Sequence, residues 1–316
     1  MNVQRIINRV CGQFLITNIK TSVFSIRLKH TKNDLENHQT KIMGRGLPEK
    51  KPLPGVKSII LVASGKGGVG KTTTAVNLAC AMKVIKPEKE IGLLDADVFG
   101  PSVPLMMNIS GEPMLNDDHL IEPLLNYGVK CMSMGLLVSG ENAVVWRGLM
   151  VMQALDRLTR HVAWGPLDCL VVDTPPGTGD THLSLAQNLP IDGAIVVTTP
   201  QSAALQVTKR GVNMFEKLKV PIIGLVENMS HAMCPKCGTK NFIFGNETKK
   251  TADEMGLEII ESFEVDSNMS ECINSGKPAI YALPDSIHAE KYRQLANKVF
   301  KYIANKDNKQ AKAKEQ

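Results

Sequence analysis

A glycine-rich segment directly after a short apolar run constrains this 316-residue chain more than any other feature. Residues 58–63, SIILVA, have the continuous apolar character of a buried parallel strand, and residues 71–84 read as a helix. The segment that joins them fits the pattern G-x-x-x-x-G-K-[ST], whose glycines let backbone N–H groups converge on phosphate oxygens at the positive end of a helix. A purely structural turn is the alternative, but the strand–loop–helix context favours phosphate binding. The segment consists of Gly65, Lys66, Gly67, Gly68, Val69, Gly70, Lys71 and Thr72.

Two side chains of this segment and three aspartates predict a nucleotide and Mg²⁺ site. We expect Lys71 to reach the β- and γ-phosphates and the Thr72 hydroxyl to bind Mg²⁺. Asp95 and Asp97 follow an apolar run over 91–94, and Asp173 follows another over 169–172. Carboxylates at the ends of parallel strands face the ligand crevice, so one can support Mg²⁺ and another can orient the attacking water. The alternative is that these aspartates have a structural role, stabilising a turn or capping a helix.

Alternating apolar runs and helical stretches predict the fold class. Further strands are expected over 194–198, 222–226 and 257–260, and further helices over 148–160, 202–218, 248–255 and 285–304. This alternation predicts an α/β fold over residues 58–304, with a doubly wound, mostly parallel sheet flanked by helices. The last helix is amphipathic and basic. Packing onto the core is its favoured role, and peripheral contact with a membrane surface is the alternative.

A Cys-x-x-Cys pair, Cys234 and Cys237 in CPKCG, lies in a loop after the strand that ends in Glu-Asn-Met. Two thiolates cannot complete a four-thiolate site within one chain, whereas a symmetric dimer supplies four. Such a set suits a 4Fe-4S cluster or a zinc ion, and an unligated thiol pair is a third alternative. The other cysteines of the body are most simply small core residues, although Cys272 lies in a polar stretch and is an alternative ligand.

The ends of the chain differ from its body. Residues 1–33 contain six basic residues and no acidic ones, which predicts a mitochondrial transit peptide over 1–38 and a location in the matrix; a basic disordered tail is the alternative. A Pro- and Gly-containing linker follows over 39–57, and residues 305–316 read as a disordered Lys-rich tail. The rest of the chain balances 31 basic against 31 acidic groups, which gives no electrostatic case for binding nucleic acid. No apolar stretch is long enough to predict a transmembrane helix.

The motifs together resemble one branch of the P-loop NTPases. The second lysine, Lys66, makes GKGGVGKT similar to the deviant Walker A motif of the MinD/ParA class, and LLDADVFGPSVP, VVDTPPGTGD, ENMS and CPKCG follow in the order typical of the Mrp/Nbp35 family. The resemblance implies an ATP-sandwich homodimer in which Lys66 reaches the partner's nucleotide. It also implies that Asp97 positions water, Asp95 serves the metal side, Asp173 is the Walker B aspartate and Asn228 contacts adenine.

This resemblance also implies a function. Members of the Mrp/Nbp35 family act as iron–sulfur cluster scaffolds and carriers, and mitochondrial members serve the assembly of respiratory complex I. We therefore expect a slow ATPase that holds a labile 4Fe-4S cluster on Cys234 and Cys237 across a homodimer and delivers it to mitochondrial apoproteins such as complex I subunits. Some cytosolic relatives carry an additional four-cysteine motif near the N-terminus, but Cys11 is the only cysteine before Cys80 here. A MinD/ParA-type positioning ATPase with a structural zinc is the alternative.

Overall fold

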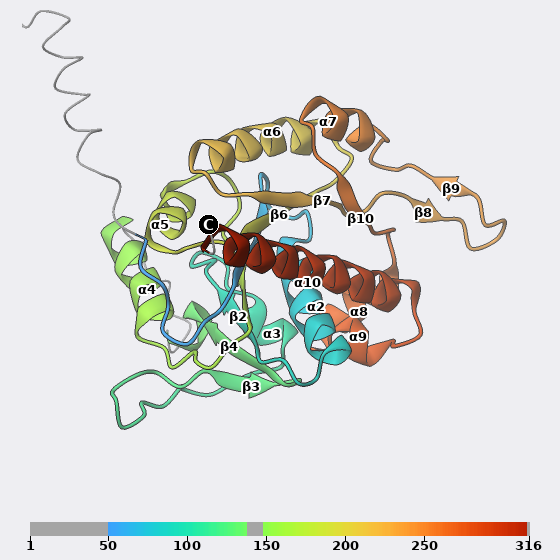
Figure 1. The fold of residues 1–316 in the computed structure, drawn as a ribbon. Helices are drawn as coiled ribbons and strands as arrows, with labels where there is room; N and C mark the ends of the chain where they lie inside the picture. Colours follow the sequence, from blue (N-terminus) through green and yellow to red (C-terminus); the bar gives the residue numbers. More distant parts are fainter. Residues whose placement is uncertain (1–49, 138–147, 315–316) are drawn as a thin grey trace, which may run out of the picture. The chain divides into compact units, whose positions relative to one another are not determined.

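The computed structural model describes residues 50–137 and 148–314. The predicted transit peptide over 1–38 and most of the predicted linker over 39–57 lie outside these residues. Within the described part, one eight-stranded sheet organises the chain, with helices on both faces (Figure 1). Helices or strands thus occupy most of the region expected to fold.

The sheet has the order β10-β7-β6-β1-β5-β2-β4-β3, and all neighbouring pairs are parallel except β3 with β4. This arrangement confirms the predicted α/β fold with a doubly wound, mostly parallel sheet. Because β1 lies in the middle of the sheet, the loop that follows it opens at the point where ligands bind in such folds. The strands are β1 (Ile59–Ser64), β2 (Ile91–Asp95), β3 (Leu124–Asn126), β4 (Val129–Ser133), β5 (Cys169–Asp173), β6 (Gly193–Thr198), β7 (Ile222–Glu227) and β10 (Ile259–Ser262).

The side chains of β1 alternate between two hydrophobic cores, one on each face of the sheet. Ile60 and Val62 belong to the first core, whereas Ile59 and Leu61 belong to the second. All four are almost completely buried, which explains why this strand reads as a continuous apolar run in the sequence. The helices that cover the sheet are α2 (Lys71–Ile85), α4 (Gly148–Arg160), α5 (Asp180–Asn188), α6 (Ser202–Lys217), α7 (Thr248–Glu254) and α10 (Ile287–Lys314).

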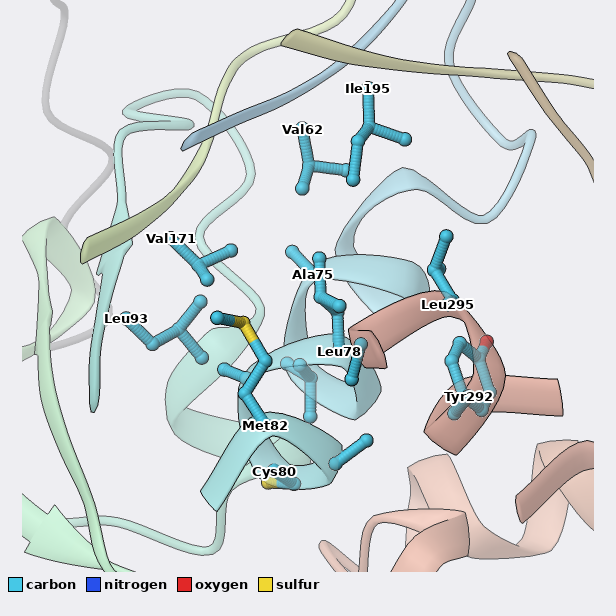
Figure 2. Close-up of a cluster of buried hydrophobic side chains, with 14 of the residues drawn as sticks. Val62, Ala75, Leu78, Cys80, Met82, Leu93, Val171, Ile195, Tyr292 and Leu295 are labelled. Carbon is cyan, nitrogen blue, oxygen red and sulfur yellow. The ribbon is translucent and has the colours of Figure 1, made fainter. Parts of the chain in front are cut away.

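The first core is packed by α2 and α10 (Figure 2). Leu78 and Met82 of α2 and Tyr292 and Leu295 of α10 are at most 3% exposed. The apolar stripe of the amphipathic C-terminal helix therefore packs on the protein core, as the sequence favours, and is not presented to a membrane surface. Among the described residues, no helix combines the length and apolar character that crossing a membrane requires.

The structure adds elements that the sequence does not predict. These are β3 and β4 at one edge of the sheet, a small separate hairpin made of β8 (Ala232–Met233) and β9 (Lys240–Asn241), a 3₁₀ turn (Met134–Leu136), the helix α5, and the short helices α3 (Val103–Met106), α8 (Ser267–Asn274) and α9 (Ala279–Ala282). Strands of two or three residues carry too few side chains for a periodic pattern to be recognised.

The C-terminal helix continues into the Lys-rich end of the chain. The sequence predicts a disordered tail over 305–316, but α10 continues to Lys314. The residues of this stretch are mostly Ala, Lys, Asn and Gln, and a helix already anchored by its first half extends through them without a new nucleation cost.

Candidate functional site

The phosphate loop, residues 65–70, joins β1 to α2 and is in tight contact with other parts of the chain. At Gly70, φ is +87° and an added Cβ would clash with Asn228 Nδ2. At Gly65, an added Cβ would lie 2.7 Å from the carbonyl carbon of Val207 in α6. These two positions require glycine. The glycines therefore allow the loop to pack against Asn228 and α6, and they also allow a phosphate to approach the backbone.

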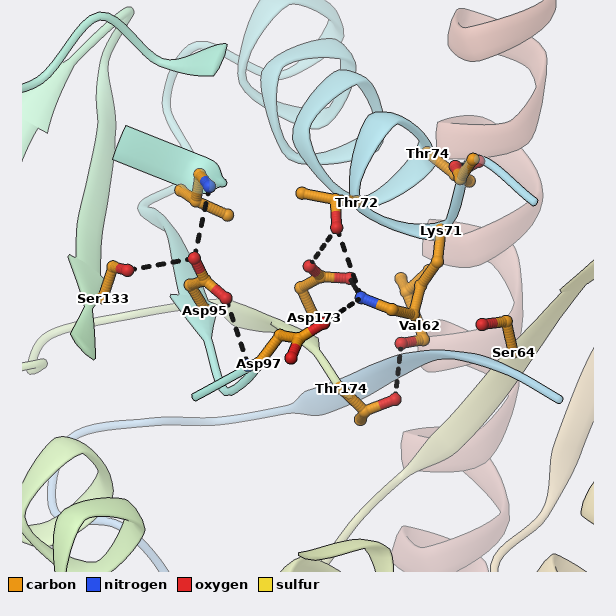
Figure 3. A network of polar contacts seen from close by, with 12 residues as sticks. Val62, Ser64, Lys71, Thr72, Thr74, Asp95, Asp97, Ser133, Asp173 and Thr174 are labelled. Atoms are coloured by element: carbon orange, nitrogen blue, oxygen red, sulfur yellow. Dashed lines mark hydrogen bonds and ion pairs between the residues drawn. The ribbon is translucent and has the colours of Figure 1, made fainter. Parts of the chain in front are cut away.

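Lys71, Thr72 and Asp173 form a compact polar group where β5 ends beside the start of α2 (Figure 3). Lys71 Nζ lies 2.6 Å from Asp173 Oδ1, and the Thr72 hydroxyl donates to Asp173 Oδ2 at 2.6 Å. The Asp173 side chain is fully buried and that of Lys71 is 7% exposed, so each charge compensates the other. The ammonium group suits a phosphate, and the Thr72 and Asp173 oxygens are of the type that Mg²⁺ prefers.

Asp95 and Asp97 leave the end of β2 in different environments. The Asp95 carboxylate is buried and accepts hydrogen bonds from the Ser133 hydroxyl at 2.9 Å and from the backbone N–H groups of Asp97 and Val103 at 3.1 and 3.2 Å. Burial, together with the nearby charge of Asp173, raises the pKa of Asp95 to about 7. The family resemblance puts Asp95 on the metal side, but its oxygens here organise the segment that follows β2.

Asp97 faces the phosphate loop instead. Its Oδ2 lies 3.9 Å from Lys71 Nζ, and its side chain is 13% exposed. It lines a cavity of about 360 Å³ together with the phosphate loop, Pro176 and Met229. The structure therefore brings Lys71, Thr72, Asp97 and Asp173 together, as the sequence predicts, with Asp97 placed to contact a group in the cavity.

We predict that Asp97→Asn binds ATP with nearly normal affinity and hydrolyses it about tenfold or more slowly, because an amide is a much weaker acceptor for a water proton. The measurement is steady-state phosphate release beside equilibrium ATP binding. Asp117→Asn, which changes an exposed aspartate outside this cavity, is the matched control. Normal turnover of Asp97→Asn would transfer the water-positioning role to another residue.

The segment after Asp173 is fixed by two residues for which the sequence pattern predicts no role. The backbone N–H and the hydroxyl of Thr174 both donate to the Val62 carbonyl at 3.1 Å, and His182 Nε2 lies 3.0 Å from Thr174 Oγ1. Since the Thr174 proton is directed to Val62, Nε2 is the donor to Thr174. Burial, together with the Lys71 charge, lowers the pKa of His182 to about 4, so the ring is neutral at physiological pH.

The same segment also contacts the end of β1, directly before the phosphate loop. Gly177 N donates to the Ser64 carbonyl at 2.9 Å, which links the Asp173 segment to the end of β1. Gly177 is one of two glycines in the sequence DTPPGTGD, the other being Gly179. The Asp173 segment is therefore hydrogen-bonded to β1 through Thr174 and Gly177 and to α5 through His182.

Asn228, directly after β7, contacts the phosphate loop from the other side. Its side-chain Nδ2 donates to the Val69 carbonyl at 2.9 Å, and its backbone N donates to the Thr198 carbonyl at 2.8 Å. The resemblance implies an adenine contact for Asn228, whereas the bond seen here holds the loop. Residues 69 and 228 are far apart in sequence, and no local signal predicts this contact.

Cys234 and Cys237 lie at the tip of the β8–β9 hairpin, which follows Asn228 by a few residues (Figure 1). Cys234 N donates to the Thr239 carbonyl at 3.0 Å and Gly238 N donates to the Cys234 carbonyl at 2.9 Å, so the turn between the cysteines is closed by backbone bonds. Cys234 is half-buried and Cys237 is exposed. Cys237 Sγ lies 3.2 Å from Thr239 Oγ1, and hydrogen bonding from Thr239 lowers the pKa of Cys237, which favours the thiolate.

Within the described residues, no third ligand joins this thiol pair. The described ranges contain no group of three or more His, Cys, Asp or Glu side chains arranged to hold a metal ion. The other described cysteines are buried, and burial raises their pKa, as expected for core residues that do not bind metal. They are Cys80, Cys131, Cys169 and Cys272.

Comparison with known proteins identifies relatives over most of the chain. The family described as the NUBPL iron-transfer P-loop NTPases, of the ParA type, matches residues 55–300. The iron–sulfur cluster transfer protein NUBPL of Mus musculus is 50% identical over 270 residues, which are 85% of this chain and 85% of that protein. The iron–sulfur protein of Arabidopsis thaliana that is required for mitochondrial NADH dehydrogenase is 54% identical over 250 residues, 79% of this chain and 80% of that protein.

Solved structures agree with this relationship. A nucleotide-binding protein from Archaeoglobus fulgidus, solved in complex with ADP and found to contain cobalt, is 34% identical with a TM-score of 0.61 over 71% of this chain and 88% of that chain. The cell-division ATPase MinD of Pyrococcus furiosus is 20% identical with a TM-score of 0.59 over 77% of this chain and 98% of that chain, which is a likeness of fold. With the family match over residues 55–300, the chain belongs to the NUBPL iron-transfer family of P-loop NTPases.

Proposed function

We propose that this protein is an ATP-dependent iron–sulfur cluster carrier that holds a labile 4Fe-4S cluster between two copies of the chain. Each copy contributes Cys234 and Cys237, and the recipients are mitochondrial apoproteins, with subunits of respiratory complex I as the first candidates. One observation carries this proposal. A thiol pair, half-buried at Cys234 and exposed at Cys237 and without a third ligand in the described residues, follows the same strand end that contacts the phosphate loop.

The environment of the thiols supports a transferable cluster. Four thiolates complete a 4Fe-4S site, and two symmetry-related hairpins supply that number. Cys237 is exposed, and hydrogen bonding from Thr239 lowers its pKa, which favours the thiolate form that binds metal. An exposed cluster is accessible to an acceptor protein, whereas a buried structural site would retain its metal. The names of the mouse and Arabidopsis relatives, which refer to iron–sulfur proteins, agree with this assignment.

The nucleotide site supports a slow, dimer-dependent ATPase. Lys71 would bind the phosphates, Thr72 and Asp173 would hold Mg²⁺, and Asp97 would orient the attacking water; the short distances among these side chains support the roles. Lys66 lies on the exposed side of the loop, where its side chain is accessible to the nucleotide of a second copy. ATP binding would thus join two chains at one face, and hydrolysis would be slow until the partner supplies Lys66.

The proposed location is the mitochondrial matrix. The acid-poor, arginine-bearing composition of residues 1–38 supports a transit peptide, and the Arabidopsis relative is named as mitochondrial.

A MinD/ParA-type positioning ATPase shares the fold, but the amphipathic α10 that would contact a membrane in such a protein is packed on the core here. That packing favours the carrier over the positioning ATPase.

The test of the proposed function is direct transfer. The protein is purified without oxygen, loaded with iron and sulfide, and mixed with an apo-enzyme whose activity needs a 4Fe-4S cluster. We expect activity to appear in the acceptor faster than from equal free iron and sulfide, and addition of ATP to change the rate. Stoichiometric zinc that iron cannot displace, with no transfer, would favour a structural zinc site instead.

A further inference from the structure

A further cavity lies at the end of the sheet opposite the phosphate loop. It has a volume of about 340 Å³, and its walls come from the residues just before β1 and β5, the end of α2 and the second half of α10. We call it the lysine cavity, because Lys57, Lys86 and Lys89 line it. β1 and β5 pair in parallel and run from this cavity toward the phosphate loop and Asp173. Among the described residues, the lysine cavity and the phosphate-loop cavity have no lining residue in common, so the two are separate.

One wall of the lysine cavity is apolar. Phe300, Ile303 and Ala304 follow the i, i+3, i+4 spacing that places side chains on one face of a helix, and α10 packs beside α2 (Figure 1). Phe300 and Ile303 are partly buried and pack against the first core. Ala304 is exposed and carries only a methyl group, so it leaves space in front of this wall. The α10 side of the cavity therefore offers apolar surface to a ligand.

Two of the lysines share a single carboxylate. The Nζ atoms of Lys57 and Lys89 lie 2.8 and 3.1 Å from the same oxygen, Asp168 Oδ1. The other oxygen, Asp168 Oδ2, accepts a hydrogen bond from the backbone N–H of Glu90 at 3.0 Å. Since one carboxylate carries one negative charge, the group formed by Lys57, Lys89 and Asp168 keeps a positive charge in excess.

The third lysine faces the apolar wall. Lys86 directly follows α2, and its Nζ lies 4.6 Å from the centroid of the Phe300 ring, which is within cation–π distance. No carboxylate in the described part of the chain forms an ion pair with Lys86. The second acid in the described lining is Asp307, which is exposed on α10. The described lining thus sets three ammonium groups against two carboxylates, beside an apolar wall.

We propose that the lysine cavity binds a small amphiphilic anion. The carboxylate or phosphate group of this ligand lies among Lys57, Lys86 and Lys89, and its apolar part lies against Ile303 and Ala304. The volume of the cavity is at the lower end of the range of about 300–1,000 Å³ that is typical of small-molecule sites, so the apolar part is short. The site is independent of the proposed carrier function, because neither the nucleotide-site residues nor the thiol pair line it.

The exposure of the lysines explains why the ligand needs both parts. The side chains of Lys57 and Lys89 are 73% and 39% exposed, so water and salt screen their attraction for a bare anion. An exposed ion pair typically changes an affinity by no more than about fivefold, whereas each buried CH₂ group changes it by about fourfold. A short apolar chain therefore supplies most of the affinity, and the lysines select for a negative head group.

Isothermal titration calorimetry of the whole chain tests this site with three probes. Octanoate joins a carboxylate to a short alkyl chain, octanol has the chain without the charge, and inorganic phosphate has the charge without the chain. We expect one octanoate to bind per chain, and octanol and inorganic phosphate each to bind at least about fivefold more weakly. A higher salt concentration should weaken the binding of octanoate and leave that of octanol nearly unchanged.

Two variants change the cavity in different ways. Lys86→Glu reverses the charge of the lysine that has no ion-pair partner in the described residues, and Ala304→Phe fills the space in front of the apolar wall. Each is expected to weaken octanoate binding about tenfold or more, the first by charge repulsion and the second by steric exclusion. Lys301→Glu is the matched control, because Lys301 is exposed on α10 and does not line the cavity. ATP affinity, measured for every variant, checks that each one is folded.

Octanoate binding that either cavity variant retains overturns the proposal, as does an equal loss of binding in Lys301→Glu. Octanoate that binds no more tightly than octanol overturns it too, since the lysines then contact no head group. Vesicles of phosphatidylcholine and phosphatidic acid form the last arm of the experiment. If these vesicles bind in a Lys86-dependent way and soluble octanoate does not bind, the lysines face a lipid surface and the small-molecule site is wrong.

Discussion

Lys71→Ala is expected to weaken ATP binding by about 100-fold or more, since a lost charge-assisted contact to phosphate is worth about 3 kcal/mol. Lys71 Nζ is buried at the end of the phosphate loop and lies 2.6 Å from Asp173 and 3.9 Å from Asp97. The substitution removes the cation and leaves the buried Asp173 carboxylate without its ion-pair partner. Both effects disfavour a bound polyphosphate, because negative charge then meets negative charge in a buried site.

Equilibrium binding of a fluorescent ATP analogue measures the effect, and thermal unfolding shows whether the variant is folded. Lys66→Ala is the matched control on the same loop. Lys66 is exposed, so we expect its loss to leave ATP binding within a few-fold of normal while hydrolysis falls and loses its dependence on protein concentration. Equal loss of binding in the two variants would show that Lys66 acts on the nucleotide of its own chain.

Cys234→Ala and Cys237→Ala are each expected to lose nearly all bound iron. The anaerobic wild type should contain about two iron atoms per chain, which is one 4Fe-4S cluster shared by two chains. Either substitution leaves one thiolate per chain and two per dimer, too few to hold the cluster. ATP binding should be retained, because neither cysteine lines the phosphate-loop cavity.

Iron, sulfide and zinc content measure this effect, with visible absorption of the same samples. Cys272→Ala is the matched control, since Cys272 is buried in α8 and is 5% exposed. It should keep wild-type iron. Iron that remains in a monomeric fraction of either cysteine variant would mean that another side chain completes the site. Zinc in place of iron in the wild type would favour the zinc knuckle.

The sequence by itself determined the features that depend on local chemistry. The apolar run over 58–63, the glycines at 65–70 and the helix from 71 specify a phosphate-binding unit because each is encoded by neighbouring residues. The alternation of strands and helices predicted the parallel sheet, since buried strands and amphipathic helices have distinct periodicities. The spacing of Cys234 and Cys237 likewise indicates a metal-binding thiol pair, because two intervening residues let both sulfurs face one metal.

Only the tertiary structure decided which residues that are distant in sequence lie together at the site and what each of them contacts. Asp95 and Asp97 are equivalent in sequence, but the fold buries one among Ser133 and two N–H groups and turns the other toward Lys71. The bond from Asn228 to Val69 joins segments 159 residues apart. The hairpin that carries the two cysteines depends on the pairing of two-residue strands. Such contacts depend on which chain segments the whole fold brings together, and a local sequence pattern does not specify those long-range contacts.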